Sequence, residues 1–171
     1  MKIERLFTRP GRGPYEGLSW ERRVSEIRNL DGRTVFRMEG VIVPSGWSQI
    51  ATDIIAQKYF RKAGIPEGKA RGWEAFVPED QRVLAGPGPA AGAEHDARQV
   101  FHRLAYTWLR WGTEEGWFDS EEDGKAFYDE TCAMLARQMA APNSPQWFNT
   151  GLHAAYGIEG PAQGHFYVDP A

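Results

Sequence analysis

The sequence predicts a mainly helical fold with a small β component, an α+β arrangement, in a chain of 171 residues. Apolar residues recur at helical spacing in three stretches, 47–63, 97–111 and 120–139, whereas only two or three short runs are rich in β-branched residues. A chain of this length can bury roughly two-thirds of its unfolded surface. We therefore expect helices to form the body of the fold around an ordinary core.

The β component is expected between residues 34 and 43. Residues 34–38 and 41–43 are rich in β-forming side chains, and the intervening Glu39-Gly40 fits a tight hairpin turn. Residues 1–32 carry many charges and scattered apolar residues, which is typical of an arm that packs on another surface. We assign 1–46 to an N-terminal arm and β-hairpin.

The first helix is expected over residues 47–63, within a helical segment spanning 47–85. Gly64 offers a left-handed cap at its end, and Pro66 prevents the helix from continuing. Its apolar stripe has helical spacing and contains Trp47, Ile50, Ala51, Ile54, Ile55 and Tyr59. A linker rich in Gly, Pro and Ala follows at 86–93 and separates this segment from 94–171.

Two longer helices are expected in the second segment. Residues 97–111 place one apolar face toward a core, and Gly112 and Gly116 should end the helix. The face contains Val100, Phe101, Leu104, Ala105, Trp108 and Trp111, with Arg98, His102 and Arg110 largely off it. Ser120 followed by three acidic residues marks the next helix start. Its stripe runs through Tyr128, Cys132, Leu135 and Met139 until Pro142 stops it, so Cys132 is expected to be an inert core residue.

The candidate site lies at Asn143-Ser144-Pro145-Gln146-Trp147. Ser144 is expected to cap a short helix with Pro145 as its first residue. The N–H groups of Gln146 and Trp147 would then point outward at the positive end of the helix dipole, where an anion such as phosphate could bind. A purely structural cap explains the same pattern, and most helix starts bind only water. Residues 165–168 resemble a final strand.

Charge and cysteine content narrow the possible functions. The net charge of −3 gives no overall field for a polyanion, so nucleic acid is not an expected partner. The single cysteine excludes an intrachain disulfide and a multi-cysteine zinc cage. No metal site is expected, because the four histidines fit no zinc motif. The sequence shows no signal peptide and no membrane-spanning run, so we expect a cytoplasmic protein.

Three blocks of the sequence together resemble the N-terminal region of the adenosylcobalamin-dependent (class II) ribonucleotide reductases. They occur in that family's order and are residues 53–66 (Asp-Ile-Ile-Ala-Gln-Lys-Tyr-Phe), 139–152 around Asn143-Ser144-Pro145, and 160–170 (Gly-Pro-Ala-Gln-Gly-His-Phe-Tyr-Val). The resemblance covers the chain from about residue 35, except for the segment 73–95. It is specific because three long blocks agree.

The resemblance implies a helical region that precedes and packs on a ten-stranded α/β barrel absent from this chain. Residues 94–171 would then form a substrate-side segment leading to the first barrel strand. Ser144 would contact the ribonucleotide substrate, with Asn143 and Gln146 as neighbouring candidates. The complete enzyme would be a ribonucleoside-diphosphate reductase that uses adenosylcobalamin and a thioredoxin-type dithiol to make deoxyribonucleotides for DNA synthesis, and it could be a homodimer.

The catalytic cysteines of that family lie in the barrel, and the surroundings of Cys132 match none of their motifs. We therefore expect the isolated chain to reduce no ribonucleotide. Two other functions remain possible. Residues 28–36 faintly resemble the start of a regulatory ATP-cone, although an Asp-Gly turn between strands explains them equally well. A helical interaction domain without a ligand of its own would use Trp73, Trp111 and Trp117 as anchors.

Overall fold

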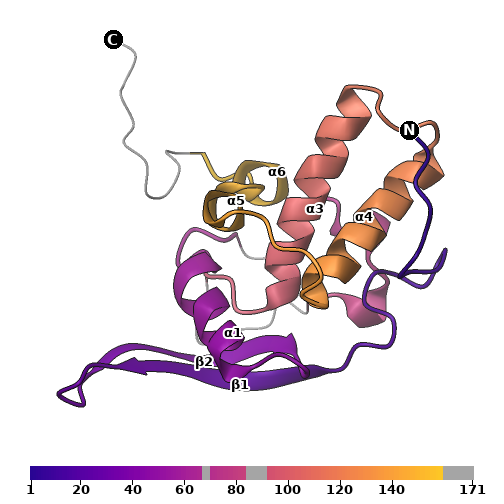
Figure 1. The fold of residues 1–171 in the computed structure, drawn as a ribbon. Coiled ribbons are helices and arrows are strands. Elements are labelled where there is room, and N and C mark those ends of the chain that lie inside the picture. The colour runs from indigo at the N-terminus through magenta and orange to yellow at the C-terminus, as the bar shows by residue number, and fades with distance from the viewer. Residues whose placement is uncertain (67–69, 84–91, 160–171) are drawn as a thin grey trace, which may run out of the picture.

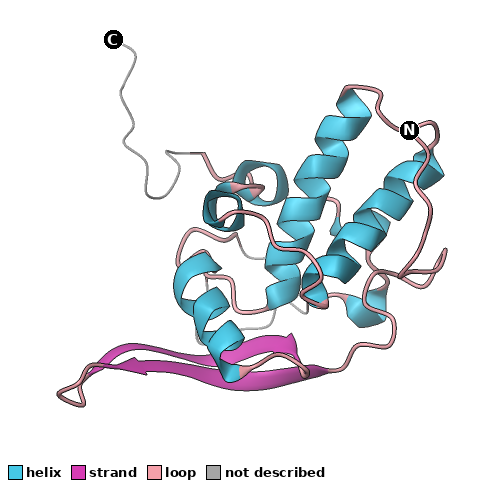
Figure 2. Ribbon diagram, viewed as in Figure 1, coloured by secondary structure: helices cyan, strands magenta, loops and turns pink. Residues whose placement is uncertain are grey.

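A computed structural model describes residues 1–66, 70–83 and 92–159. Two long neighbouring helices, α3 (Ala97–Glu114) and α4 (Glu121–Ala136), form the body of the molecule (Figure 1). A two-stranded antiparallel sheet of β1 (Trp20–Arg28) and β2 (Thr34–Pro44) lies at one end (Figure 2). The prediction of a mainly helical fold with a small β component is confirmed.

The remaining elements are short and surround this body. The first pair is α1 (Gln49–Ile54), which continues directly as a π-helix, η1 (Ile55–Tyr59). A turn of helix, α2 (Trp73–Phe76), and a 3₁₀ turn, η2 (Glu79–Gln81), follow before α3. After α4 the chain forms α5 (Ser144–Asn149) and α6 (Leu152–Tyr156), which lie beside α3 (Figure 1).

The hairpin differs from the one predicted. Residues 34–44 form one continuous strand, and its partner β1 comes from the segment that we expected to be an arm. The turn lies at residues 29–33, where Gly32 has a φ of 81°. Gly40 has a φ of 73° and lies where the register shifts between Arg23 and Ser25, so it forms a bulge. A glycine with positive φ serves a bulge as readily as a turn, and local sequence does not distinguish the two.

The ATP-cone-like residues 28–36 form the tip of this hairpin. The Asn29 N–H donates to the Arg33 carbonyl at 2.9 Å, and the Asp31 carboxylate accepts the Arg33 N–H at 3.0 Å. Both contacts are typical of a tight Asp-Gly turn. A tight turn at the tip of the hairpin therefore explains the sequence of residues 28–36.

The first helix ends earlier than predicted and buries a different face. It stops at Tyr59 instead of Ala63, and Gly64 adopts its positive φ in the loop beyond. Ile50 and Ile54 are exposed, although both belong to the predicted stripe. The buried residues of this helix are Thr52, Ile55 and Ala56. The widening into a π-helix shifts the residues that face the core.

Helix α3 buries most of its predicted apolar stripe and also residues outside that stripe. Val100, Phe101, Leu104 and Ala105 are fully buried, while Trp111 is 49% exposed. His102 was expected off the apolar face but is fully buried, as is the neighbouring Arg103. Helix α3 is covered on several sides, by α4, α5, α6 and β2, so one buried stripe does not describe it. The helix also runs through Gly112, which lies against Phe118.

The start of α4 is as predicted. The Ser120 hydroxyl accepts the Asp123 N–H at 3.2 Å, and acidic residues occupy the first turn. Cys132 lies on the buried face, as expected. Met139 is wrong as a stripe member, because α4 ends at Ala136, Gln138 takes a positive φ of 56°, and Met139 is exposed.

The N-terminal segment packs along α4 (Figure 1). The terminal amine pairs with Asp119, and Arg5 pairs with Asp129 at 2.7 Å. Three consecutive backbone N–H groups, of Leu6, Phe7 and Thr8, donate to the Glu130 carboxylate at 2.8–3.1 Å. Polar contacts therefore hold a segment that forms no helix or strand.

Two predictions fall outside the described residues. The predicted linker at 86–93 lies there except for its last two residues, and the strand predicted at 165–168 lies there completely. The third block of the family resemblance, 160–170, is also outside.

Candidate functional site

The helix start at the candidate site uses a different cap from the one predicted. Asn143 is the N-cap, with φ −61° and ψ 151°, and its side-chain oxygen accepts the Ser144 N–H at 2.9 Å. Ser144 is thus the first helical residue and Pro145 the second. The reason is local, since Asn and Ser are comparable caps and the chain turns one residue earlier. The Ser144 hydroxyl is consequently free of the capping role.

The anion site predicted at this helix start loses support. The Gln146 N–H, expected to point outward, donates to the Asn143 carbonyl at 2.9 Å. Helix α5 has only six residues, so few peptide dipoles add up at its N-terminus. The groups at this site that could contact a ligand are instead side chains.

Two hydroxyl groups meet at the surface here. The Ser144 Oγ lies 3.2 Å from the Tyr59 hydroxyl, and Ser144 is exposed. The Tyr59 ring stacks on Trp147 with centroids 5.4 Å apart and planes 16° apart. Trp147 is buried, so it fixes both the helix and the tyrosine to the core. Tyr59 was predicted only as a stripe residue, although it lies in the first block of the family resemblance.

The other two candidate residues flank Ser144 and are exposed. Asn143 uses its side-chain oxygen for the cap. Gln146 accepts a hydrogen bond from the Thr150 hydroxyl through its side-chain oxygen, and its backbone carbonyl accepts the Thr150 N–H at 3.0 Å. The structure therefore brings all three predicted residues to one turn of α5, with two of their amide oxygens already occupied.

A buried ion pair lies behind this surface. The Arg103 Nε donates to Glu94 Oε1 at 2.8 Å, and both side chains are 0% exposed. The guanidinium also donates to the backbone carbonyls of Trp147 at 2.6 Å, Thr150 at 2.8 Å and Tyr59 at 3.1 Å. Sequence reasoning missed this pair, because a cation at a helical position normally predicts an exposed face.

Another buried polar contact joins α3 to α4. His102 Nδ1 lies 2.6 Å from the Tyr128 hydroxyl, and its Nε2 lies 2.9 Å from the Arg71 carbonyl. Burial lowers the pKa of His102 to about 4, so the ring is neutral at neutral pH. A neutral ring donates from one nitrogen and accepts at the other, which matches a carbonyl on one side and a hydroxyl on the other. His102 is therefore a structural residue.

The single cysteine has no features of a redox or nucleophilic residue. Cys132 is fully buried, and its Sγ lies 3.8 Å from the Phe101 carbonyl. Burial raises the pKa of the Cys132 thiol to about 12. The reactive form of cysteine is the thiolate, so this thiol is held in its unreactive form at neutral pH.

The described residues include no group of three or more His, Cys, Asp or Glu side chains that could hold a metal ion. Across the same part of the chain, no helix combines the length and apolar character needed to cross a bilayer. Trp73 is buried, while Trp111 and Trp117 are about half exposed. The prediction of Trp73 as a surface anchor is thus wrong, whereas the exposure of Trp111 and Trp117 suits such a role.

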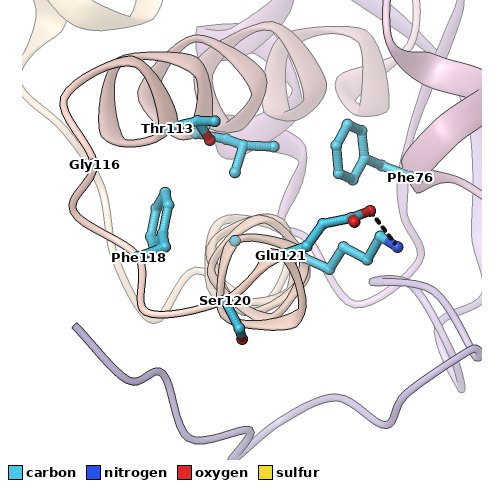
Figure 3. A pocket seen from close by; sticks show the side chains of 9 residues that line it. Phe76, Thr113, Gly116, Phe118, Ser120 and Glu121 are labelled. Atoms are coloured by element: carbon cyan, nitrogen blue, oxygen red, sulfur yellow. Dashed lines mark ion pairs between the residues drawn. The ribbon is translucent and has the colours of Figure 1, made fainter.

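A pocket of about 440 Å³ lies between α3 and α4 (Figure 3), and Ser144 is not among the residues that line it. Its apolar wall includes Phe76, Leu109 and Phe118. Glu121 and Lys125 also line it and form an ion pair at 2.9 Å. The two charges pair with each other, and no cysteine or histidine lines the pocket. It therefore shows no catalytic grouping.

Comparison with known proteins identifies the family. Residues 21–138 match the family model described as class II vitamin B12-dependent ribonucleotide reductase. Proteins named vitamin B12-dependent ribonucleotide reductase from Agrobacterium fabrum and Bradyrhizobium diazoefficiens are 54% and 51% identical over 99% of this chain. One from Rhodopirellula baltica is 35% identical over 88% of it.

The chain spans only a small part of these relatives. It covers 14% of the length of the Agrobacterium and Bradyrhizobium proteins and 12% of the Rhodopirellula protein. The family model matches more than half of the chain and ends before Asn143, whereas the first two relatives align across nearly all of it. The chain therefore belongs to the class II vitamin B12-dependent ribonucleotide reductase family.

Proposed function

We propose that this chain is the N-terminal part of an adenosylcobalamin-dependent ribonucleotide reductase and supplies the Ser144 hydroxyl to the ribonucleotide site. The family provides the reaction class, which is reduction of a ribonucleotide to a deoxyribonucleotide for DNA synthesis. One observation supports the role of Ser144. Its hydroxyl is exposed, is not used as a helix cap, and has a second hydroxyl, that of Tyr59, at 3.2 Å.

The chemistry itself belongs to the rest of the enzyme in this proposal. Ribonucleotide reduction requires a cysteine that becomes a thiyl radical and a cysteine pair that delivers two electrons. This chain has only Cys132, a buried thiol with a pKa raised by burial to about 12. The catalytic cysteines, adenosylcobalamin and a thioredoxin-type dithiol would therefore act in a barrel portion outside the chain, on a ribonucleoside diphosphate.

The proposed site is suited to groups of the substrate that form hydrogen bonds. Each hydroxyl of the Ser144–Tyr59 pair can donate one hydrogen bond and accept others. The amide groups of Asn143 and Gln146 can donate further hydrogen bonds through their nitrogens. Such a group of neutral donors can bind ribose hydroxyls or phosphate oxygens.

Substitution of Ser144 in the complete reductase tests the proposal. Loss of a hydrogen bond to a charged partner costs about 1.5–3 kcal/mol, so Ser144→Ala should weaken binding of a ribonucleoside diphosphate roughly ten- to a hundredfold. Stability should change by less than about 0.5 kcal/mol, because Asn143 provides the cap. Ser144→Thr should retain most affinity, and Ser144→Asp should repel a phosphate.

Ser120→Ala is the matched control. Ser120 also begins a helix, but its hydroxyl is the actual cap of α4. Its removal should cost about 1 kcal/mol of stability and leave substrate affinity unchanged. If Ser144→Ala and Ser144→Asp both fold and bind the diphosphate as tightly as wild type, Ser144 has no role in binding.

A second function is favoured by the exposure of Trp111 and Trp117, which suits a surface that contacts the barrel portion. Replacing both with Ser should weaken association of this chain with a separately produced barrel portion. Unchanged association in a pull-down would exclude this surface.

A further inference from the structure

We propose that Arg103, together with its partner Glu94, is a positioning residue that sets the relative placement of the Ser144 and Tyr59 hydroxyls. This inference rests on the proposed function of Ser144. It adds a residue that lies inside the protein and touches no substrate. The relevant observation is that one guanidinium joins the two segments that carry the two hydroxyls.

The two segments are far apart in the sequence and meet at Arg103. The Tyr59 carbonyl belongs to the last residue of η1, and the guanidinium holds it at 3.1 Å. The carbonyls of Trp147 and Thr150 lie at the end of α5, and the guanidinium holds them at 2.6 Å and 2.8 Å. Carbonyls at a helix end have no partner within the helix and carry the negative end of its dipole. Arg103 therefore acts as one shared cap for two short helices.

Glu94 fixes the guanidinium in the orientation that this requires. Its two oxygens accept from Arg103 Nε at 2.8 Å and Nη2 at 3.2 Å. It also accepts the Arg61 N–H at 2.8 Å and the Tyr156 hydroxyl at 2.9 Å. Both charged groups are thus fully buried and hydrogen-bonded on several sides. Arg61 follows Tyr59 closely, so Glu94 and Arg103 hold the same segment.

The pattern of acceptors requires an arginine. Its five donors lie in one plane with a fixed fork geometry, which can serve a carboxylate and carbonyls in different directions. A lysine carries a single ammonium group at that place and can keep the contact with Glu94, but it cannot reach all three carbonyls. Buried ion pairs often give little net stability compared with apolar side chains of the same size. The contacts of this pair with three backbone carbonyls therefore favour a geometric role over a stabilising one.

Gly151 provides a second observation on how the end of α5 is held against α3. It follows Thr150, has a φ of 88°, and lies so close to α3 that an added Cβ would overlap the Arg103 carbonyl. Arg103 therefore holds the end of α5 through its side chain and limits its position through its backbone. A substitution at Gly151 moves the same helix without altering any charge.

The test uses the complete reductase and measures binding of a ribonucleoside diphosphate together with kcat/KM. Arg103→Lys should lower kcat/KM and weaken binding about ten- to a hundredfold, as expected when binding groups are displaced by about 1 Å. Gly151→Ala should have an effect of the same kind. Gly112→Ala is the matched control, because its added methyl would press on Phe118 near α4 and not on α5. It should leave binding unchanged.

A double-mutant cycle separates positioning from general damage. If Arg103 acts through Ser144, Arg103→Lys should have little further effect on binding in a Ser144→Ala background, so the two effects are not additive. Additive losses, or wild-type binding by Arg103→Lys and Gly151→Ala, would overturn the inference while leaving Ser144 in its proposed role. Wild-type binding by Ser144→Ala and Ser144→Asp would instead overturn the proposed function.

Discussion

Glu94, just before α3, and Glu130, in α4, are both buried carboxylates, and each holds a neighbouring segment against the helical body. Glu94 is 0% exposed and is paired with the equally buried Arg103. Glu130 is 7% exposed and accepts hydrogen bonds from the N–H groups of residues 6–8 and from the Thr8 hydroxyl at 2.6 Å. One anchor is an ion pair, and the other is a carboxylate held by hydrogen-bond donors.

The comparison indicates that the depth at which a carboxylate is buried determines which groups must surround it. A fully buried carboxylate needs an opposite charge and several hydrogen bonds to offset its lost hydration. Near the surface, aligned N–H groups are sufficient, because they act as a concave site for an anion. Burial raises the pKa of Glu130, but the hydrogen bonds from Thr8, Leu6 and Phe7 outweigh burial and lower the pKa below its ordinary value.

The largest effect is expected at the deeper anchor. Glu94→Gln should destabilise the chain by about 3–5 kcal/mol, because it leaves the buried Arg103 charge without an anion. Urea unfolding measures this change. The double substitution Glu94→Met with Arg103→Met should recover only part of the loss, since no charge then remains buried but the backbone carbonyls that Arg103 held lose their donor. A loss below about 1 kcal/mol for the single variant would remove the distinction between the two anchors.

The shallower anchor should cost less and should depend on pH. Glu130→Gln should destabilise by about 1–3 kcal/mol at pH 7, because the amide accepts fewer hydrogen bonds from residues 6–8. The folded pKa of Glu130 is lowered from 4.5, so its stabilisation is complete above that value and is lost as pH falls through the folded pKa. Unfolding measured from pH 7 to pH 3 should show this loss in wild type and a smaller one in the variant. Equal pH dependence would contradict it.

Cys132→Ala gives the baseline for an ordinary small deletion in the core. Cys132 is fully buried with its Sγ 3.8 Å from the Phe101 carbonyl, and the change should cost roughly 1 kcal/mol. Activity of the complete enzyme should stay near normal, because burial raises the pKa of this thiol to about 12 and holds it in its unreactive form. Loss of ribonucleotide reduction in a variant that folds normally would show that Cys132 takes part in the chemistry.

The sequence alone determined the features that depend on residues within about one helical turn. The start of α4 at Ser120, the start of a short helix near Ser144 and the burial of Val100, Phe101, Leu104 and Ala105 in α3 follow from caps and from helical periodicity. The family could also be identified, because long blocks of sequence keep their order. Helix caps and the spacing of apolar residues involve only residues that are close in the sequence, so these features can be predicted without knowledge of the rest of the fold.

Only the tertiary structure decided features that depend on distant partners. The pairing of β1 with β2, the end of η1 at Tyr59 and the burial of Arg103 each require contacts made across many residues. The helix ends at Tyr59 because Arg103 takes its carbonyl and Glu94 takes the Arg61 N–H, so backbone groups that would extend the helix are bonded elsewhere. A buried charge becomes favourable only when its partners have been brought together, and no local pattern records where those partners lie.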